Sequence, residues 1–256
     1  MISSAAEVVR ILRHSDGYVS GETIAAELGV SRAAVWKHIK SLRDTGFDIC
    51  AFTNRGYRLL SVPDIPSSEV LSSILNTTVF GRSVEYYPVI ASTNERAMEL
   101  GRLGAASGTV VTADRQTAGK ARNGGVWPSP SGKNLYLSIL VRPEVELSRA
   151  EEVALAGLRA LGSAAGNLFP LLAFEQRNSG LFCNNRKVGG VLCEVQGEIG
   201  RIHHLVVGVG LNVSHHGHGD GTESLYSLSG KLLPRAELIA SVLEAFEWIY
   251  NEWRSE

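Results

Sequence analysis

The residues with the clearest capacity for chemistry lie in a glycine-rich basic loop, residues 115–134, with the sequence RQTAGKARNGGVWPSPSGKN. The loop has neither helical nor strand periodicity, and it mixes small residues with lysines and arginines. Backbone N–H groups and a cation in such a loop can close over a phosphate or a carboxylate. The alternative is an ordinary surface loop, so its composition alone leaves both interpretations open.

A second candidate group is the histidine-rich stretch 214–220, with the sequence SHHGHGD. Imidazoles at this density can bind zinc, nickel or copper, which makes His215, His216 and His218 candidate metal ligands. No regular element fixes their geometry, so the leading expectation is a solvated loop and no metal site.

A third group consists of cations on a segment with helix-turn-helix spacing. Residues 21–28 are expected to form a short helix, and Gly29 suits the left-handed turn that ends it. Ser31 is well placed to cap a second helix over residues 32–43, with apolar positions 35, 39 and 42 facing inward. Residues 47–60 then alternate as a hairpin, which completes the order of a winged helix.

The outward positions of this unit predict a DNA-binding surface. Arg32 and Lys37 are expected to reach base edges, Lys40 or Arg55 a backbone phosphate, and the N–H of Ser31 another phosphate. The alternatives are a solvated charged face or a protein-interaction module. The predicted DNA-binding residues are Ser31, Arg32, Trp36, Lys37, Lys40 and Arg55.

The rest of the chain alternates strand-like and helix-like segments, and the predicted class is α+β with a mixed sheet. Strands are expected at 84–87, 109–113, 134–142, 188–196 and 202–213, and helices at 93–103, 150–165 and 235–253. Two prolines within VPDIPSS (62–68) interrupt helix and mark a stiff connector. The predicted domains are therefore 1–62 (winged helix-turn-helix), 63–67 (linker) and 68–256 (ligand-binding domain).

Composition limits the function classes. The 256 residues carry a formal net charge of -1, but residues 1–62 have eight Lys/Arg against six Asp/Glu, while the remainder is acidic. This asymmetry favours nucleic-acid contact by the front end alone. No apolar run is long enough for a membrane helix, and the start lacks a signal-peptide pattern. Three widely spaced cysteines favour a reducing, cytoplasmic compartment.

Several motifs in order resemble the biotin protein ligases that double as biotin-operon repressors. They are SRAAVWKHIKSLRDTGFDI (31–49), IASTN (90–94), the QTAG loop with Trp127, NLYLS (134–138), RKVGGVLCEV (186–195) and VVGVGLNV (206–213). The resemblance covers about residues 5–255. It implies a class II synthetase-like, biotin/lipoate ligase-like domain after the winged helix. It also implies a small C-terminal β-barrel domain, which nothing up to Glu256 resembles.

The resemblance also implies a ligand site for biotin or biotinyl-AMP, with ATP and Mg2+ only if the chain is catalytically active. Polar residues would fix the ureido ring, Lys187 would lie beside the carboxylate, glycines would allow close approach, and Lys187 and Arg122 would be catalytic in an active enzyme. The implied ligand-binding residues are Ser92, Thr93, Asn94, Gln116, Gly119, Lys120, Arg122, Trp127, Lys187, Gly189, Gly190, Gly208, Gly210 and Asn212. Taken singly, each has another explanation: residues 92–94 also suit a helix cap, and Lys187 a surface position.

The chain departs from the family pattern in two places. The loop motif G-R-G-R-x-G-R-x-W reads GKARNGGVW (119–127), so Ala121 would restrict a backbone that needs positive φ, and Gly125 removes a cation. The family's K-W-P-N-D is replaced by Gln176–Gly180, which removes a phosphate-holding lysine and a carboxylate. Losing one such charge-stabilising group typically costs about 10²–10³ in rate.

Three hypotheses follow. The first is a ligand-responsive repressor that senses biotin, a related acid or its adenylate, binds operator DNA as a homodimer, and has weakened or lost ligase activity. The second is an active ligase that makes biotinyl-AMP, modifies biotin carboxyl carrier protein and also represses. The third is a metal-responsive regulator that uses the histidine-rich stretch.

Overall fold

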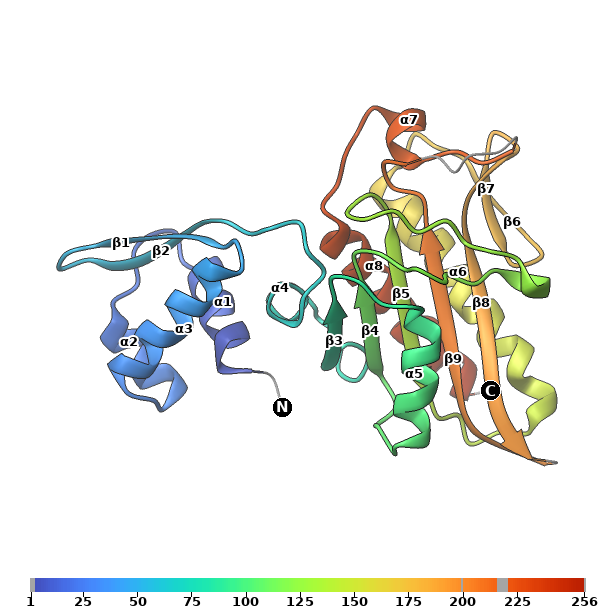
Figure 1. Ribbon diagram of the computed structural model, residues 1–256, viewed down its shortest axis with the longest axis horizontal. Coiled ribbons are helices and arrows are strands. Elements are labelled where there is room, and N and C mark those ends of the chain that lie inside the picture. The colour runs from blue at the N-terminus through green and yellow to red at the C-terminus, as the bar shows by residue number, and fades with distance from the viewer. Residues whose placement is uncertain (1–2, 199, 216–220, 256) are drawn as a thin grey trace.

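The computed structural model describes residues 3–198, 200–215 and 221–255 and begins with a small unit separate from the main sheet (Figure 1). Three helices and a hairpin form this unit: α1 (Ser4–Arg13), α2 (Gly21–Leu28), α3 (Arg32–Asp44), β1 (Asp48–Phe52) and β2 (Gly56–Ser61). The Ser31 hydroxyl accepts a hydrogen bond from Ala34 N at 3.2 Å, and Gly29 ends α2 with a φ of 64°. The predicted helix-turn-helix and wing are therefore confirmed.

The larger unit is built on a seven-stranded mixed sheet. Its order is β3 (Ser83–Tyr87), β4 (Thr109–Ala113), β5 (Leu135–Val141), β9 (Arg201–Leu211), β8 (Arg186–Glu198), β7 (Gly180–Cys183) and β6 (Phe174–Arg177). Only β3 and β4 are parallel. The accompanying helices are α4 (Ser68–Ser72), α5 (Thr93–Arg102), α6 (Ala150–Leu168), α7 (Leu225–Ser229) and α8 (Arg235–Ser255), with single turns η1 (Arg122–Gly124) and η2 (Leu147–Arg149).

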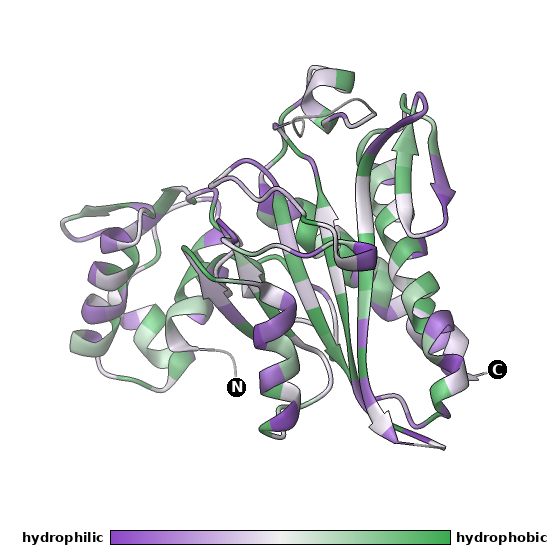
Figure 2. Cartoon of the chain, turned by 45° about the vertical axis from the view of Figure 1, so that its right-hand side comes forward, coloured by the Kyte–Doolittle hydropathy of each residue, from purple (hydrophilic) through white to green (hydrophobic). Residues whose placement is uncertain are grey.

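Helices cover both faces of the sheet. Neighbouring residues of a strand point to opposite faces, and β9 shows which helix lies on each. A Cβ at Gly208 would meet Asn94 of α5, whereas the side chain of Val207 packs against Gly157 of α6. All seven residues of β5 are buried because helices pack against both of its faces. Figure 2 shows the hydrophobic colouring of the central strands and hydrophilic stretches on α5.

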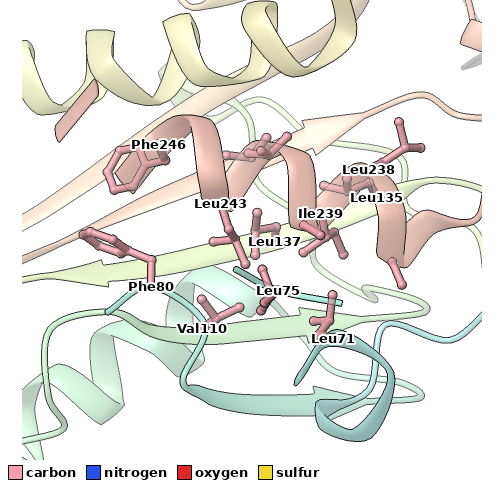
Figure 3. Packing of buried hydrophobic residues seen from close by; sticks show 14 of the residues in the cluster. Leu71, Leu75, Phe80, Val110, Leu135, Leu137, Leu238, Ile239, Leu243 and Phe246 are labelled. Carbon is pink, nitrogen blue, oxygen red and sulfur yellow. The ribbon is translucent and has the colours of Figure 1, made fainter. Parts of the chain in front are cut away.

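The main core lies between the sheet, α6 and α8. Figure 3 shows side chains of α8 packed over residues of α4, β4 and β5. Phe80 and Phe246 meet edge to face, with ring centroids 5.0 Å apart. The neighbouring Glu247 carboxylate accepts hydrogen bonds from the backbone N–H groups of Thr78, Val79 and Phe80 at 2.6, 2.8 and 2.9 Å. This carboxylate fixes the turn before β3 to the closing helix.

The segment between the two units is docked onto the larger one. Arg235, which is 3% exposed at the start of α8, donates through Nε to Asp64 Oδ2 at 3.2 Å and through a terminal nitrogen to Asp114 Oδ1 at 2.8 Å. Thr112 Oγ1 donates to the carbonyl of Pro66 at 2.7 Å. We retain 63–67 as the proposed linker between domains 1–62 and 68–256, and it is a bound segment rather than a loose tether.

Within the parts of the chain given above, no helix has both the length and the apolar composition needed to cross a membrane.

Candidate functional site

The predicted ligand residues meet at an open-mouthed cavity of about 60 Å³. It lies on the α5 side of the sheet, between the start of α5, the glycine-rich loop and strands β8 and β9. Its lining includes these residues predicted from the sequence: Ser92, Thr93, Asn94, Gln116, Lys120, Arg122, Trp127, Lys187, Gly190, Gly208 and Gly210. It also includes residues outside the predicted ligand-binding set: Ala121, Leu137, Ser179, Val191, Leu192 and Val209.

One wall of the cavity is polar and tightly bonded. The Gln116 side-chain carbonyl accepts hydrogen bonds from Thr93 N at 2.8 Å and Thr93 Oγ1 at 3.0 Å, and its amide donates to Ser129 Oγ at 3.0 Å. Ser92 is the N-cap of α5, and its hydroxyl accepts from Glu95 N at 3.5 Å. The helix cap and the polar wall are therefore the same residues, so the two explanations of positions 92–94 are compatible.

Asn94 connects α5 to three strands. Its Oδ1 accepts from Ser138 Oγ at 2.6 Å, and its Nδ2 donates to Glu194 Oε2 at 2.9 Å. Asn94 is 5% exposed, and a Cβ at Gly208 would lie 2.1 Å from its Oδ1. Glycine at 208 is therefore required for the close approach of β9 to α5. Ser138 and Glu194, which the sequence analysis missed, hold this amide in one orientation.

The glycine-rich loop forms a small irregular hairpin, residues 119–127, over the cavity. Backbone hydrogen bonds join Trp127 N to Gly119 O and Ala121 N to Gly125 O, both at 2.8 Å. The positive φ angles fall on Asn123 (57°) and Gly124 (73°), whereas Ala121 is extended with a φ of -119°. The expectation that Ala121 strains a backbone in need of positive φ is therefore wrong, because the turn lies two residues later.

Trp127 packs its ring on the floor of the cavity. A Cβ at Gly210 would lie 2.5 Å from Trp127 Cε2, so glycine there makes room for the indole. The indole Nε1 is buried and has no hydrogen-bond partner in the described part of the chain. A buried unpaired donor is costly, and an acceptor atom on a bound ligand would satisfy it.

Three cations line the cavity in different electrostatic states. Burial lowers the pKa of Lys187, whose Nζ lies 5.4 Å from the centroid of the Trp127 ring. Lys120 Nζ lies 2.9 Å from Glu95 Oε1 and 3.6 Å from Glu194 Oε1, and its hydrogen bond to Glu95 raises the pKa of Lys120. Among the described residues, Lys187 and Arg122 have no carboxylate partner, so they are available to an anionic ligand.

Three predicted ligand residues lie outside this lining. A Cβ at Gly189 would meet Leu161 of α6, because residue 190 faces the cavity and its neighbour must face the other side. Gly119 supports the hairpin, with Trp127 O and Ser129 Oγ within 2.6 Å of where its Cβ would be. Asn212 ties the end of β9 to the segment after it, since its Nδ2 donates to Glu223 O at 3.2 Å.

The register of the β6–β7 hairpin changes the interpretation of Gln176–Gly180. Gln176 pairs with Leu181, on the face that packs against α6, and its amide lies beside Gly162 of that helix. Arg177 and Gly180 face the cavity side instead. Arg177 is not part of the lining, because it bonds to Glu175 and Asn185 and stacks on Phe182. Position 176 is therefore not where a phosphate-holding side chain would reach the cavity in this chain.

The predicted DNA-binding residues are all exposed on the N-terminal unit. Val35, Ile39 and Leu42 are buried as expected, whereas Trp36 is 54% exposed. A groove runs between α3 and the wing, and Arg32, Trp36 and Arg55 line it. The Arg55 guanidinium also stacks on Tyr18, 4.8 Å from the ring centroid. Ser31, Lys37 and Lys40 are exposed beside the groove without lining it.

The candidate metal ligands are mostly beyond what the structure describes. His216 and His218 lie outside the described residues, and only His215 is inside them. The described residues contain no group of three His, Cys, Asp or Glu side chains suited to a metal ion.

Comparisons with known proteins match both units. The family description "HTH domain" matches residues 5–58, and "Biotin/lipoate A/B protein ligase family" matches residues 86–212. The bifunctional ligase/repressor BirA of Bacillus spizizenii is 34% identical over 246 residues, which cover 92% of this chain and 74% of that protein. The BirA of Escherichia coli is 33% identical over 200 residues, covering 76% of this chain and 59% of that protein.

A helix-turn-helix with a wing, joined to a biotin/lipoate ligase domain, defines a class of two-part ligase/repressor proteins. The chain belongs to the bifunctional biotin ligase/repressor family. The solved biotin protein ligase of Aquifex aeolicus, in complex with biotin and ATP, is similar with a TM-score of 0.58 and 26% identity over 68% of this chain and 72% of that one. The ligase of Leishmania major with biotinyl-5-AMP has the same TM-score at 20% identity, covering 67% and 76%, and shares the fold.

Proposed function

We propose that this chain is a DNA-binding repressor that senses biotin, a related small acid or its adenylate, with ligase activity that is weakened or lost. The observation that carries the proposal is one cavity with a bonded polar wall, an aromatic floor and two cations that have no carboxylate partner among the described residues, on a chain that also has a winged helix. Relatives named ligase/repressor, and a solved ligase with biotin and ATP, support the same ligand class.

The chemistry of the cavity suits biotin. A ureido ring offers one carbonyl acceptor and two N–H donors, and the hydroxyls and amides of Ser92, Thr93, Asn94 and Gln116 supply both kinds of partner. The apolar part of the ligand would lie along side chains such as Leu137 and Trp127. Its carboxylate would pair with Lys187 or Arg122, as charge-assisted hydrogen bonds favour.

Weakened adenylation is supported by what faces the cavity from the β6–β7 hairpin. Gly180 offers no carboxylate, and the Arg177 guanidinium is already bound to Glu175 and Asn185. Among the described residues of the lining, Lys120, Arg122 and Lys187 are the cations that could then stabilise charge formed on a phosphate during adenylation. Since one missing donor of this kind typically costs about 10²–10³ in rate, a substantially slowed reaction is expected.

DNA binding and dimerisation complete the proposal. Arg32, Trp36, Lys37, Lys40, Arg55 and the start of α3 at Ser31 are proposed to contact operator DNA. The later part of β8 pairs with β9 but continues beyond the end of β7, so its other edge has no strand partner in the described structure. An unpaired strand edge is a template for another strand, which supports pairing between two copies.

The test begins with calorimetric titration of the purified chain with biotin in the absence of ATP. A dissociation constant of about 1 μM or lower, roughly 8 kcal/mol of binding free energy, is expected. Biotin should also increase the affinity of the chain for an operator fragment. Incubation with biotin and ATP should release little or no pyrophosphate. Both results together would support a biotin-sensing repressor with weakened ligase activity. Absence of biotin binding would refute the proposal.

The second candidate is an active ligase, and one observation favours it. Lys120, Arg122 and Lys187 all line the cavity, so three cations face any phosphate placed there. In this case Lys187 and Arg122 would be the catalytic residues, and ATP with Mg2+ would be required. Transfer of biotin to a biotin carboxyl carrier protein at a rate that falls in Lys187→Met and Arg122→Ala would establish this candidate over the first.

A further inference from the structure

A carboxylate without a role in the proposed ligand contacts lies beside the cavity. Glu194 follows Gly190 and Leu192 on the same face of β8, and both of these residues line the cavity. Its Oε2 accepts a hydrogen bond from Asn94 Nδ2 at 2.9 Å, and its Oε1 lies 3.6 Å from Lys120 Nζ. Its side chain is 30% exposed, so solvent only partly screens it.

This carboxylate changes the charge that a ligand meets. Lys120, Arg122 and Lys187 are the cations of the lining, and Lys120 is shared between Glu95 and Glu194. These three positive and two negative side chains together carry a formal net charge of +1. One positive charge matches a single carboxylate, whereas a triphosphate carries several negative charges.

We propose that Glu194 is a specificity-determining residue that makes the cavity prefer a singly charged carboxylic acid over a polyphosphate. This inference rests on the proposed function, because it concerns the same ligand site. Glu194 repels each negative charge of a ligand, so the electrostatic repulsion is larger for a triphosphate, which carries several charges, than for a carboxylate, which carries one.

The Asn94 hydrogen bond makes this penalty hard to avoid. Asn94 is 5% exposed, and it is held by Ser138 on one side and confined by Gly208 on the other. A carboxylate bonded to such a fixed amide cannot swing away from an incoming anion without losing the bond. Glu194 therefore repels polyanions from a fixed position.

The test compares Glu194→Gln with wild type by calorimetric titration, using biotin and magnesium-free ATP as separate probes. The glutamine carbonyl can still accept from Asn94, so the variant removes the charge and keeps the hydrogen bond. Glu194→Asp keeps the charge and shortens the side chain. Glu198→Gln is the matched control, since Glu198 lies on the same strand, 70% exposed and 3.5 Å from His203. Glu95→Gln, at a side chain 50% exposed, provides a second charge removal with little risk to folding.

The expected result is a ratio of ATP affinity to biotin affinity that rises about fivefold or more in Glu194→Gln, as about 1 kcal/mol of removed repulsion implies. A smaller rise is expected in Glu95→Gln, and none in Glu194→Asp or Glu198→Gln. The difference should shrink in 1 M salt because screening weakens charge effects.

Two outcomes would overturn the inference while leaving the proposed function standing. One is biotin binding with an unchanged affinity ratio in Glu194→Gln. The other is an equal shift in Glu194→Asp, which would mean that shape and not charge is responsible. Failure of the wild-type chain to bind biotin would instead refute the proposed function, and this inference with it.

Discussion

Replacing Gly208 with alanine tests the geometry of the cavity directly. The new Cβ would lie 2.1 Å from Asn94 Oδ1 and 2.8 Å from Asn94 Nδ2, which is far closer than real contacts. Either β9 must move away from α5, or Asn94 must leave its hydrogen bonds to Ser138 and Glu194. In both cases, the wall that presents Asn94 to the ligand is disrupted.

The magnitude follows from two costs. Overpacking of a tight contact costs about 1–3 kcal/mol, and each lost hydrogen bond costs about 0.5–1.5 kcal/mol. We therefore expect Gly208→Ala to lower the free energy of unfolding by about 2–4 kcal/mol. The dissociation constant for biotin should rise at least about tenfold, which corresponds to roughly 1.4 kcal/mol.

The assay combines urea unfolding with calorimetric titration under conditions where the variant is folded. The control is Gly166→Ala in α6, where the new Cβ meets nothing within 4 Å. That change should stabilise the chain by about 0.5–1 kcal/mol, because glycine is unfavourable inside a helix. Wild-type stability and wild-type biotin affinity in Gly208→Ala would refute the argument for close approach at this site.

Three further predictions concern single side chains. Burial lowers the pKa of Lys187, so its ammonium loses its proton at a lower pH than an ordinary lysine does. The affinity for biotin, measured by calorimetry, should therefore decline as pH rises into that range. Lys187→Met should raise the dissociation constant about tenfold and remove this decline. Burial alone would raise the pKa of Glu247, but the hydrogen bonds from residues 78–80 outweigh it and lower that pKa. The free energy of unfolding that the Glu247 carboxylate contributes is therefore fully present above the ordinary carboxyl pKa. It is lost as pH falls through the lowered pKa of Glu247. Urea unfolding of Glu247→Gln should show a loss of about 2 kcal/mol at neutral pH and a smaller loss in acid; an equal loss at both would contradict this. Lys40→Ala should weaken binding to operator and unrelated DNA alike and reduce the slope of log affinity against log salt by about one, whereas an effect on the operator alone would indicate base contact.

Local signals made much of the fold predictable. Ser31, Gly29 and the hairpin after residue 46 specify the winged helix through caps and turns that act within a few residues. The long strands and helices of the larger unit were recognisable from their apolar periods. Strands β6 and β7 were not, because four-residue strands around a turn at Asn178 carry too short an alternation to detect.

The predicted site depended more on resemblance than on local pattern. Family motifs identified most of the cavity lining, but they did not specify which face of a strand each residue occupies. Gly189 and Gln176 were misplaced for this reason, since the register of β6, β7 and β8 decides their side. Ser138 and Glu194 were missed because their role depends on Asn94, which is distant in sequence.

The docked linker affects which spacing between two DNA half-sites a dimer could bind. Arg235 holds Asp64 and Asp114 together, and Thr112 holds Pro66, so the segment leading to the winged helix is fixed to the larger unit at two positions. A long flexible tether would let each recognition helix search a wide volume and tolerate variable half-site spacing. In a dimer of this chain, the distance between the two recognition helices would instead be set by how the two ligand-binding domains pair. Operators with one or two base pairs inserted at the centre should then bind more weakly, because the winged helices cannot move far enough to reach both half-sites.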